Sequence, residues 1–438
     1  MQFSGPFLAY LQKKLTKQLL ANVSPPDTLA GCVIASHSRE NPAYFYHWFR
    51  DAALAVQSAL HSPTLSASAQ RHLILDWFSF EAECARSIDK NRELRRAGEP
   101  KVHVDAKPFT EPWGRPQNDS SALRLFVGLE ALELLHRQGF RQQAARQFEL
   151  LLVRDLHYTA EHIGKACFDV WEEVHGMHFA TLATQCAALS AALLSRWLSA
   201  ELRDTCSAAL QRGEAQIADY LEKTDYVPYI VSTLHPNNYG PLERGWCDSS
   251  VLLAVCKCRR SMLLQPRVVR TVLHLANQFA ALYPLNRGHR LPLLGRYAED
   301  HYYGGNPWPI CTCFAIEWCY SAAAHLLAHP DLDKETQIAL QELLSRFGLV
   351  TIDGSSLNHR KLGNHLTQLG DQWFERLLSE MTQASNKHSI FKSNFHYSEQ
   401  LDRTSGRWCS AERLTWNYAA LLDIVNARIA LEKCTDDK

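Results

Sequence analysis

Three glutamates stand in short segments rich in aromatic residues, and their carboxyl groups could transfer protons. Glu172 and Glu173 are adjacent in the segment W-E-E, and Glu399 lies in the segment Y-S-E-Q. Two adjacent carboxylates raise the pKa of one member, which suits a general acid near neutral pH. Hydrolysis of a glycosidic bond normally needs one carboxyl group that protonates the leaving oxygen and a second that activates water or attacks the sugar. The glutamates are candidates for that chemistry, although either segment alone is a weak signal.

Flat aromatic side chains and planar polar side chains accompany these glutamates. A sugar ring has apolar C–H faces and a rim of hydroxyl groups, so a sugar site needs both kinds of surface. The aromatic candidates are Tyr44, Phe45, Tyr46, Trp48, Phe49, Trp113, Trp171, Tyr297, Tyr302, Tyr303 and Trp308. The polar candidates are Arg50, Asp51, Arg115, Asp119, Arg296 and Asp300. Any one aromatic residue could simply pack beneath a loop, but their concentration in a few segments favours a sugar-binding site.

Five segments contain these residues, and each stands just before a long helical pattern. They read NPAYFYHWFRD, EPKVHVDAKPFTEPWGRPQND, FDVWEEVHG, LGRYAEDHYYGGNPW and HYSEQLDRTSG. Loops carry function when a rigid scaffold holds them together in space. Five loops that enter successive helices would converge at one end of a helical barrel.

Helical periodicity dominates the chain, and strand patterns are scarce. Twelve helices are predicted, over residues 7–20, 50–60, 66–88, 121–137, 140–159, 181–197, 202–221, 248–256, 266–283, 312–325, 334–347 and 415–430. No low-complexity linker divides the chain and no short sequence repeat is evident, so a helical repeat array is not indicated. The pattern therefore predicts one closed all-α domain over residues 1–438.

The balanced charge of the chain gives no electrostatic reason to expect a nucleic-acid or membrane partner. The 438 residues include 46 basic and 46 acidic ones, so the chain is neutral, and neither a nucleic-acid nor a membrane partner is expected. Of the 13 cysteines, the close pairs Cys256/Cys258 and Cys311/Cys313 lack the C-x-x-C spacing of zinc ribbons and redox motifs. We expect mostly reduced, buried thiols, at least one of them unpaired, and a monomer.

The N-terminal segment lacks the order of a secretory signal, because Lys13, Lys14 and Lys17 follow a short apolar stretch instead of preceding one. No stretch approaches the roughly 18 apolar residues of a membrane span. We expect a soluble protein made in the cytoplasm, with signal-independent export left open. Because no H-E-x-x-H motif or close His/Asp cluster is present, neither a metal nor a cofactor is expected.

Taken together, the quoted segments resemble the glucoamylases of glycoside hydrolase family 15. The matching stretches are NPAYFYHWFRDAAL, GEPKVHVD, EPWGRPQNDSSALR, DVWEEVHG, GRYAEDHYYGGNPW, YSEQLDRTSG and RLTWNYAALL, in the family's order from residue 41 to about 422. This resemblance implies an (α/α)6 barrel and an inverting exo-hydrolase, a glucan 1,4-α-glucosidase that releases β-glucose from the non-reducing ends of glycogen, starch or maltooligosaccharides. Because such a barrel would use nearly all of the chain, neither a starch-binding module nor an N-terminal β-sandwich domain is expected.

The resemblance also implies roles for individual residues. Glu172 matches the general acid and Glu399 the general base, and Arg50 and Asp51 match the pair that holds the terminal glucose. The other implied or candidate substrate-binding residues are Tyr44, Trp48, Trp113, Arg115, Trp171, Glu173, Arg296, Tyr297, Asp300, Tyr302, Trp308 and Trp416. Among them, Trp113 would support the acid, and the leaving sugar would meet Glu173, Arg296 and Tyr302.

Departures from the family pattern are modest and leave both proposed catalytic groups in place. They are Phe49 for a small polar residue, Ser120-Ser121 for Gly-Pro, Val170 for leucine and His175 for asparagine. Two alternatives stay open. One is a catalytically silent glucan-binding or regulatory barrel, which the retention of both glutamates disfavours. The other is a barrel hydrolase with α-1,6-glucoside or trehalose specificity, in which the leaving-sugar subsite would differ.

Overall fold

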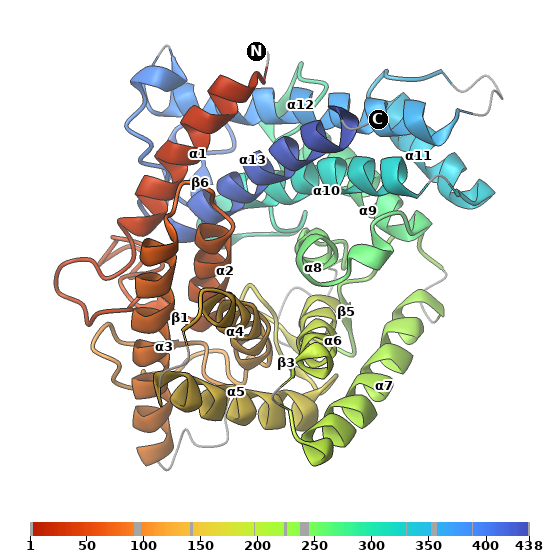
Figure 1. The fold of residues 1–438 in the computed structure, drawn as a ribbon. Coiled ribbons are helices and arrows are strands. Elements are labelled where there is room, and N and C mark those ends of the chain that lie inside the picture. The colour runs from red at the N-terminus through yellow and green to blue at the C-terminus, as the bar shows by residue number, and fades with distance from the viewer. Residues whose placement is uncertain are drawn as a thin grey trace.

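The computed structural model describes residues 3–91, 98–140, 143–196, 198–222, 226–236, 245–329, 331–351, 357–387 and 389–436. Helices dominate this part of the chain (Figure 1). They are α1 (Gly5–Leu20), α2 (Phe49–Leu60), α3 (Ala67–Lys90), α4 (Asp119–Arg137), α5 (Gln143–His162), α6 (Phe179–Leu194), α7 (Ala200–Glu222), α8 (Ser250–Cys258), α9 (Pro266–Leu282), α10 (Pro309–Ala328), α11 (Lys334–Arg346), α12 (His359–Ala384) and α13 (Thr415–Asp436).

Six of these helices close into an inner ring. α2 contacts α4, α4 contacts α6, α6 contacts α8, α8 contacts α10, α10 contacts α13, and α13 returns to α2. The other helices pack around this ring: α1 on α13, α3 and α5 on α4, α7 on α6, α9 on α8 and α12 on α10, with α11 against α9. This is the (α/α)6 barrel, so the predicted all-α barrel fold is confirmed.

Burial explains why the inner helices are apolar. Every residue of α2 is buried, because its neighbours in the ring and its outer partners surround it. α10 is long and apolar enough to cross a membrane by length and composition, which corrects the expectation that no stretch comes near that limit. Of its most apolar window, 83% is buried inside the protein, as its place in the ring requires.

No helix was predicted at α12, whose 26 residues make it the longest described helix. Its buried face repeats at helical spacing, with Leu362, Leu366, Leu369, Trp373 and Leu377 all inaccessible to solvent, so the signal was present. The twelve predicted ranges each overlap one helix, with bounds that differ by a few residues. Residues 141–142 and 197, which fall in two of those ranges, lie outside the described part of the chain.

The five aromatic segments enter five inner helices, namely α2, α4, α6, α10 and α13. Short antiparallel strands join these segments and their neighbours. β1 (His47–Trp48) pairs with β2 (Lys101–Val102), and β6 (Gln400–Leu401) pairs with β7 (Trp408–Cys409). β4 (His175–His178) lies between β3 (Cys167–Phe168) and β5 (Thr233–Leu234) and pairs with both. Each strand has only two to four residues, which is too short for a periodic pattern in the sequence. The predicted convergence of the loops at one end of the barrel is confirmed by the cavity that they share.

Candidate active site

A cavity of about 400 Å³ is lined by residues of all five aromatic segments and by the first turn of α13. Most of the predicted site residues line it: Tyr44, Trp48, Arg50, Asp51, Trp113, Trp171, Glu172, Glu173, Arg296, Tyr302, Trp308, Glu399 and Trp416. Both proposed catalytic glutamates therefore face one cavity, although 227 positions separate them in the chain.

Two indoles hold the Glu172 carboxyl group. Trp48 Nε1 donates to Oε1 at 2.7 Å, and Trp113 Nε1 donates to Oε2 at 2.7 Å. The Arg50 guanidinium lies 3.5 Å from Oε1. Glu172 has a φ of 68°, a left-handed conformation that is strained for a residue other than glycine and is retained mainly at functional sites. The surrounding loops thus fix both the backbone and the carboxyl group of this residue.

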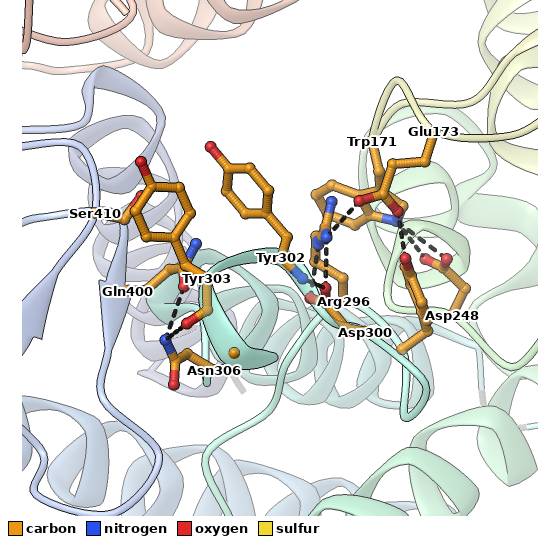
Figure 2. A network of polar contacts seen from close by, with 12 residues as sticks. Trp171, Glu173, Asp248, Arg296, Asp300, Tyr302, Tyr303, Asn306, Gln400 and Ser410 are labelled. Atoms are coloured by element: carbon orange, nitrogen blue, oxygen red, sulfur yellow. Dashed lines mark hydrogen bonds and ion pairs between the residues drawn. The ribbon is translucent and has the colours of Figure 1, made fainter. Parts of the chain in front are cut away.

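Glu173 and Glu172 have different hydrogen-bond partners, although their adjacency suggested that the two carboxyl groups act on each other. Glu173 Oε1 pairs with an Arg296 nitrogen at 2.7 Å (Figure 2). The Tyr297 hydroxyl donates a short hydrogen bond to Oε2. Burial raises the pKa of Glu173, and Arg296 offsets part of that rise. The two carboxyl groups therefore do not form a proton-sharing pair, because each has its own set of donors.

Glu399 is a buried carboxyl group, and two side chains donate hydrogen bonds to one of its oxygens. The Ser410 hydroxyl donates a short hydrogen bond to Oε2, and Gln400 Nε2 donates to the same atom at 2.9 Å. Asn306 fixes the Gln400 amide at 3.1 Å and donates to the Tyr303 carbonyl at 2.8 Å (Figure 2). Burial raises the pKa of Glu399 to about 7, although the donors offset part of the rise. A raised pKa strengthens this carboxylate as a base but requires a pH high enough to ionise it.

Buried polar atoms without hydrogen-bond partners lie at Arg50 and Asp51. Arg50 is 5% exposed and forms ion pairs with Asp51 at 3.4 Å and Asp119 at 3.5 Å. Even so, Arg50 Nε and Asp51 Oδ2 are buried and make no hydrogen bond within the described structure. Burial also raises the pKa of Asp51 to about 6, with Arg50 opposing the shift. Unsatisfied buried polar atoms are costly, so a ligand with hydroxyl groups would stabilise this part of the site.

Three tryptophans provide the flat surface of the cavity. The ring centroids of Trp171 and Trp416 lie 6.2 Å apart with 29° between the ring planes, and those of Trp171 and Trp308 lie 5.9 Å apart. Asp248 holds Trp171, because the indole Nε1 donates to both carboxylate oxygens at 2.9 and 3.0 Å. Trp308 Nε1 is buried without a hydrogen-bond partner among the described residues and is another candidate donor to a ligand.

Three predicted substrate-binding residues do not line the cavity: Arg115, Tyr297 and Asp300. Arg115 pairs with Glu99 at 2.8 Å and braces its own loop. Tyr297 donates to Glu173, as described above. Asp300 accepts two hydrogen bonds from the Arg296 guanidinium, at 2.6 and 2.8 Å (Figure 2). In this structure these three residues support the cavity wall, and their part in substrate binding stays a prediction.

The sequence analysis also passed over residues that shape the site. Lys101 lies in the quoted segment GEPKVHVD and lines the cavity, but a single lysine gave no signal of a role. Asp248 ends the segment that enters α8, the one inner helix whose entry was not recognised as an aromatic loop. Ser410 follows the quoted loop before α13 and has no distinctive neighbours. Asp248 and Ser410 stand shortly before α8 and α13, and that position is the one signal that could have indicated them.

Comparison with known proteins agrees with this geometry. Residues 9–426 match the model of glycosyl hydrolases family 15. The intracellular sporulation-specific glucoamylase of Saccharomyces cerevisiae is 28% identical, with 95% of this chain and 83% of the relative covered. The probable glucoamylase of Schizosaccharomyces pombe is also 28% identical, with coverage of 93% and 86%. The solved glucoamylase of Hormoconis resinae superimposes with a TM-score of 0.81 at 26% identity, with coverage of 97% and 74%. Because the family match spans nearly the whole chain and its fold is that of the solved relative, the chain belongs to glycosyl hydrolases family 15.

Proposed function

We propose that this glycosyl hydrolase is a glucoamylase that removes single glucose units from the non-reducing ends of α-1,4-glucans and releases them as β-D-glucose. One observation carries the proposal: Glu172 and Glu399 line the same cavity as Arg50 and Asp51, whose side chains each hold a buried polar atom without a hydrogen-bond partner among the described residues. That cavity therefore combines two carboxyl groups with a place for sugar hydroxyls.

The terminal glucose would bind beside Arg50 and Asp51. Arg50 Nε and Trp308 Nε1 can donate to sugar oxygens, and Asp51 Oδ2 can accept from a sugar hydroxyl, which would satisfy all three buried atoms. The rings of Trp171 and Trp416 offer a surface for the apolar C–H faces of the sugar. The same contacts would be absent for an internal sugar that cannot reach them, so the site favours chain ends.

Glu172 would act as the general acid. Its carboxyl group, held by Trp48 and Trp113, would transfer a proton to the glycosidic oxygen as the bond to the leaving sugar breaks. Glu399 would act as the general base. It would take a proton from a water molecule, whose oxygen attacks the anomeric carbon from the opposite face and inverts its configuration.

The proposal also covers the substrate class, the oligomeric state and the cellular compartment. We propose soluble substrates such as glycogen and maltooligosaccharides, acted on by a monomer inside the cell. The twelve described cysteines are unpaired and ten of them are buried, which is compatible with a reducing compartment. The leaving-sugar side, formed by Trp113, Glu173 and Tyr302, would decide between α-1,4, α-1,6 and trehalose linkages.

Product stereochemistry tests the proposal. Maltotriose is mixed with the protein and the anomeric signals are followed by NMR before mutarotation equilibrates them. We expect β-glucose first, with rates on maltotriose exceeding those on isomaltose and trehalose. Early α-glucose would contradict the inverting mechanism, and faster hydrolysis of isomaltose or trehalose would assign the other linkage specificity. A folded protein that releases no glucose from any of these would indicate a silent glucan-binding barrel.

A further inference from the structure

A buried lysine sits among the aromatic residues of the cavity wall. Lys101 is 2% exposed and lies in β2 directly opposite Trp48 of β1. Its Nζ lies 3.2 Å from the ring centre of Trp113, 4.2 Å from that of Phe109, 4.3 Å from that of Trp48 and 4.9 Å from that of Tyr46. Four ring faces therefore surround one ammonium group, an arrangement that binds cations through the negative potential of the rings.

Lys101 has no carboxylate ion partner among the residues that the structure describes, unlike Lys257, which pairs with both Glu317 and Asp423. Burial lowers the pKa of Lys101 to about 8, and the more distant charge of Glu172 opposes that shift. Burying a cation without an ion pair is costly. Retaining one here suggests that the charge has a use at this position.

Two of the four rings are the ones that hold Glu172. Trp113 and Trp48 place their ring faces toward Lys101 and their N–H groups on the two oxygens of the Glu172 carboxyl group. Trp113 is 40% exposed at the cavity rim, so packing alone fixes it weakly. A cation over its face would hold the ring in place and would also polarise its N–H bond toward the carboxylate.

We propose that Lys101 is a positioning residue for Glu172: its ammonium group fixes the two indoles that hold the carboxyl group and supplies a positive charge behind them. The proposal rests on the proposed function, because it takes Glu172 as the general acid. No direct contact between Lys101 and the substrate is required.

The charge of Lys101 has a predictable effect on the pH profile. A positive charge near a catalytic acid opposes its protonation, so removing the charge of Lys101 should move the basic limb of the kcat profile to higher pH. Other charged or titratable groups near these two residues stay in place in such a variant: Arg50, Asp51, Asp119 and Tyr44 beside Glu172, and Glu111 and Arg115 beside Lys101. Glu173, next to Glu172 in the chain, is already paired with Arg296.

The test compares Lys101→Met, Lys101→Arg and Lys107→Met. Lys107 is a matched control because it lies in the same loop but is 75% exposed and pairs with Asp105. For Lys101→Met we expect kcat on maltotriose to fall at least tenfold and the basic limb of the kcat profile to move up by about 0.5–1 pH unit. Lys101→Arg should keep the limb near its wild-type position, because it keeps the charge. Lys107→Met should change neither quantity.

A second readout does not depend on turnover. The indole N–H resonances of Trp48 and Trp113, assigned with Trp→Phe variants, should both shift in Lys101→Met and remain near wild type in Lys107→Met. A Lys101→Met protein with wild-type basic limb and wild-type indole resonances would overturn the proposal, even if it were less stable. An inactive wild-type protein would instead count against the proposed function, and the resonances would still report whether Lys101 holds the indoles.

Discussion

At the scale of single residues, the ionisation of Glu399 is set by burial on one side and by two donors on the other. Burial raises its pKa to about 7, while the hydrogen bonds from Ser410 and Gln400 stabilise the carboxylate and limit the rise. A general base works only when deprotonated, so activity should be present above this pKa and lost as the pH falls through it. The donors therefore widen the pH range of activity on its acidic side.

Replacing Ser410 by alanine should move the acidic limb of the profile to higher pH. The change removes a donor from the Glu399 carboxylate, which raises the pKa of Glu399 further and should shift the limb by about one pH unit. The measurement is kcat/KM for maltotriose between pH 4 and 9, which reports the free enzyme. Ser405→Ala, in the exposed turn before β7, is the matched control. An unchanged limb, or one moved to lower pH, would mean that Glu399 is not the ionising base.

Replacing Asp51 by asparagine should weaken transition-state binding. Asp51 Oδ2 is a buried acceptor without a hydrogen-bond partner, and we expect a sugar hydroxyl to donate to it. Loss of a charged acceptor of this kind costs about 2–4 kcal/mol, or about 30- to 1,000-fold in kcat/KM. Steady-state kinetics on maltose and maltotriose would measure the change, with the exposed residue Asp105 mutated to asparagine for comparison. If kcat/KM fell by less than about threefold on both substrates, the terminal sugar would not bind at Asp51.

Residue types and motifs indicated most of the cavity lining, but not what each side chain contacts. Trp48 and Trp113 were predicted site residues, yet their shared task of holding Glu172 depends on three loops that are distant in the chain. Glu173 was expected to act on its neighbour, but the turn at Glu172 directs it to Arg296 instead. No local sequence pattern indicates Asp248, because its role is to accept a hydrogen bond from the Trp171 indole, which is distant in the chain.

At the scale of elements, helical periodicity indicated a closed all-α domain, and the resemblance to the glucoamylases implied the (α/α)6 barrel. Inner helices such as α2 are buried all round, whereas outer helices such as α12 are amphipathic. α12 was overlooked although its buried face repeats at spacings of three and four. The two-residue strands β1 and β2 could not have been predicted from any pattern, since their pairing depends on the approach of two loops.

The packing of the apolar face of α12 on α10 predicts which substitutions in α12 lower the free energy of unfolding. Leu369→Ala should lower the free energy of unfolding by about 2–5 kcal/mol, because Leu369 is fully buried and its loss leaves a cavity. Gln368→Ala, at the adjacent exposed position of the same helix, should change it by less than about 0.5 kcal/mol. Urea unfolding followed by circular dichroism measures both. Equal effects at the two positions would contradict the assigned helix face.

At the scale of the whole molecule, closure of the ring brings distant parts of the chain together. The first and last helices are neighbours (Figure 1), and Gln12 of α1 donates to Asn426 of α13 at 2.6 Å. α13 in turn completes the inner ring against α2 and brings the loop that carries Glu399 to the cavity. Glu172 and Glu399 therefore line one cavity because the barrel closes. No local sequence pattern could have indicated how far apart they lie.

The division of labour between these two glutamates is the central claim, and a comparison of two substrates tests it most directly. Glucose release is measured from maltotriose and from α-glucosyl fluoride for the wild type, Glu172→Gln, Glu399→Gln and the control Glu111→Gln, a carboxyl group in the same cavity wall. Fluoride leaves without needing a strong proton donor, so the acid is needed far less with that substrate.

We predict that both glutamate variants lose at least about a hundredfold in kcat on maltotriose. On α-glucosyl fluoride, Glu172→Gln should recover most of its activity while Glu399→Gln stays inactive, and Glu111→Gln should resemble the wild type on both. Recovery of Glu399→Gln instead of Glu172→Gln would reverse the two roles. Near-wild-type activity of either variant on maltotriose would contradict the account.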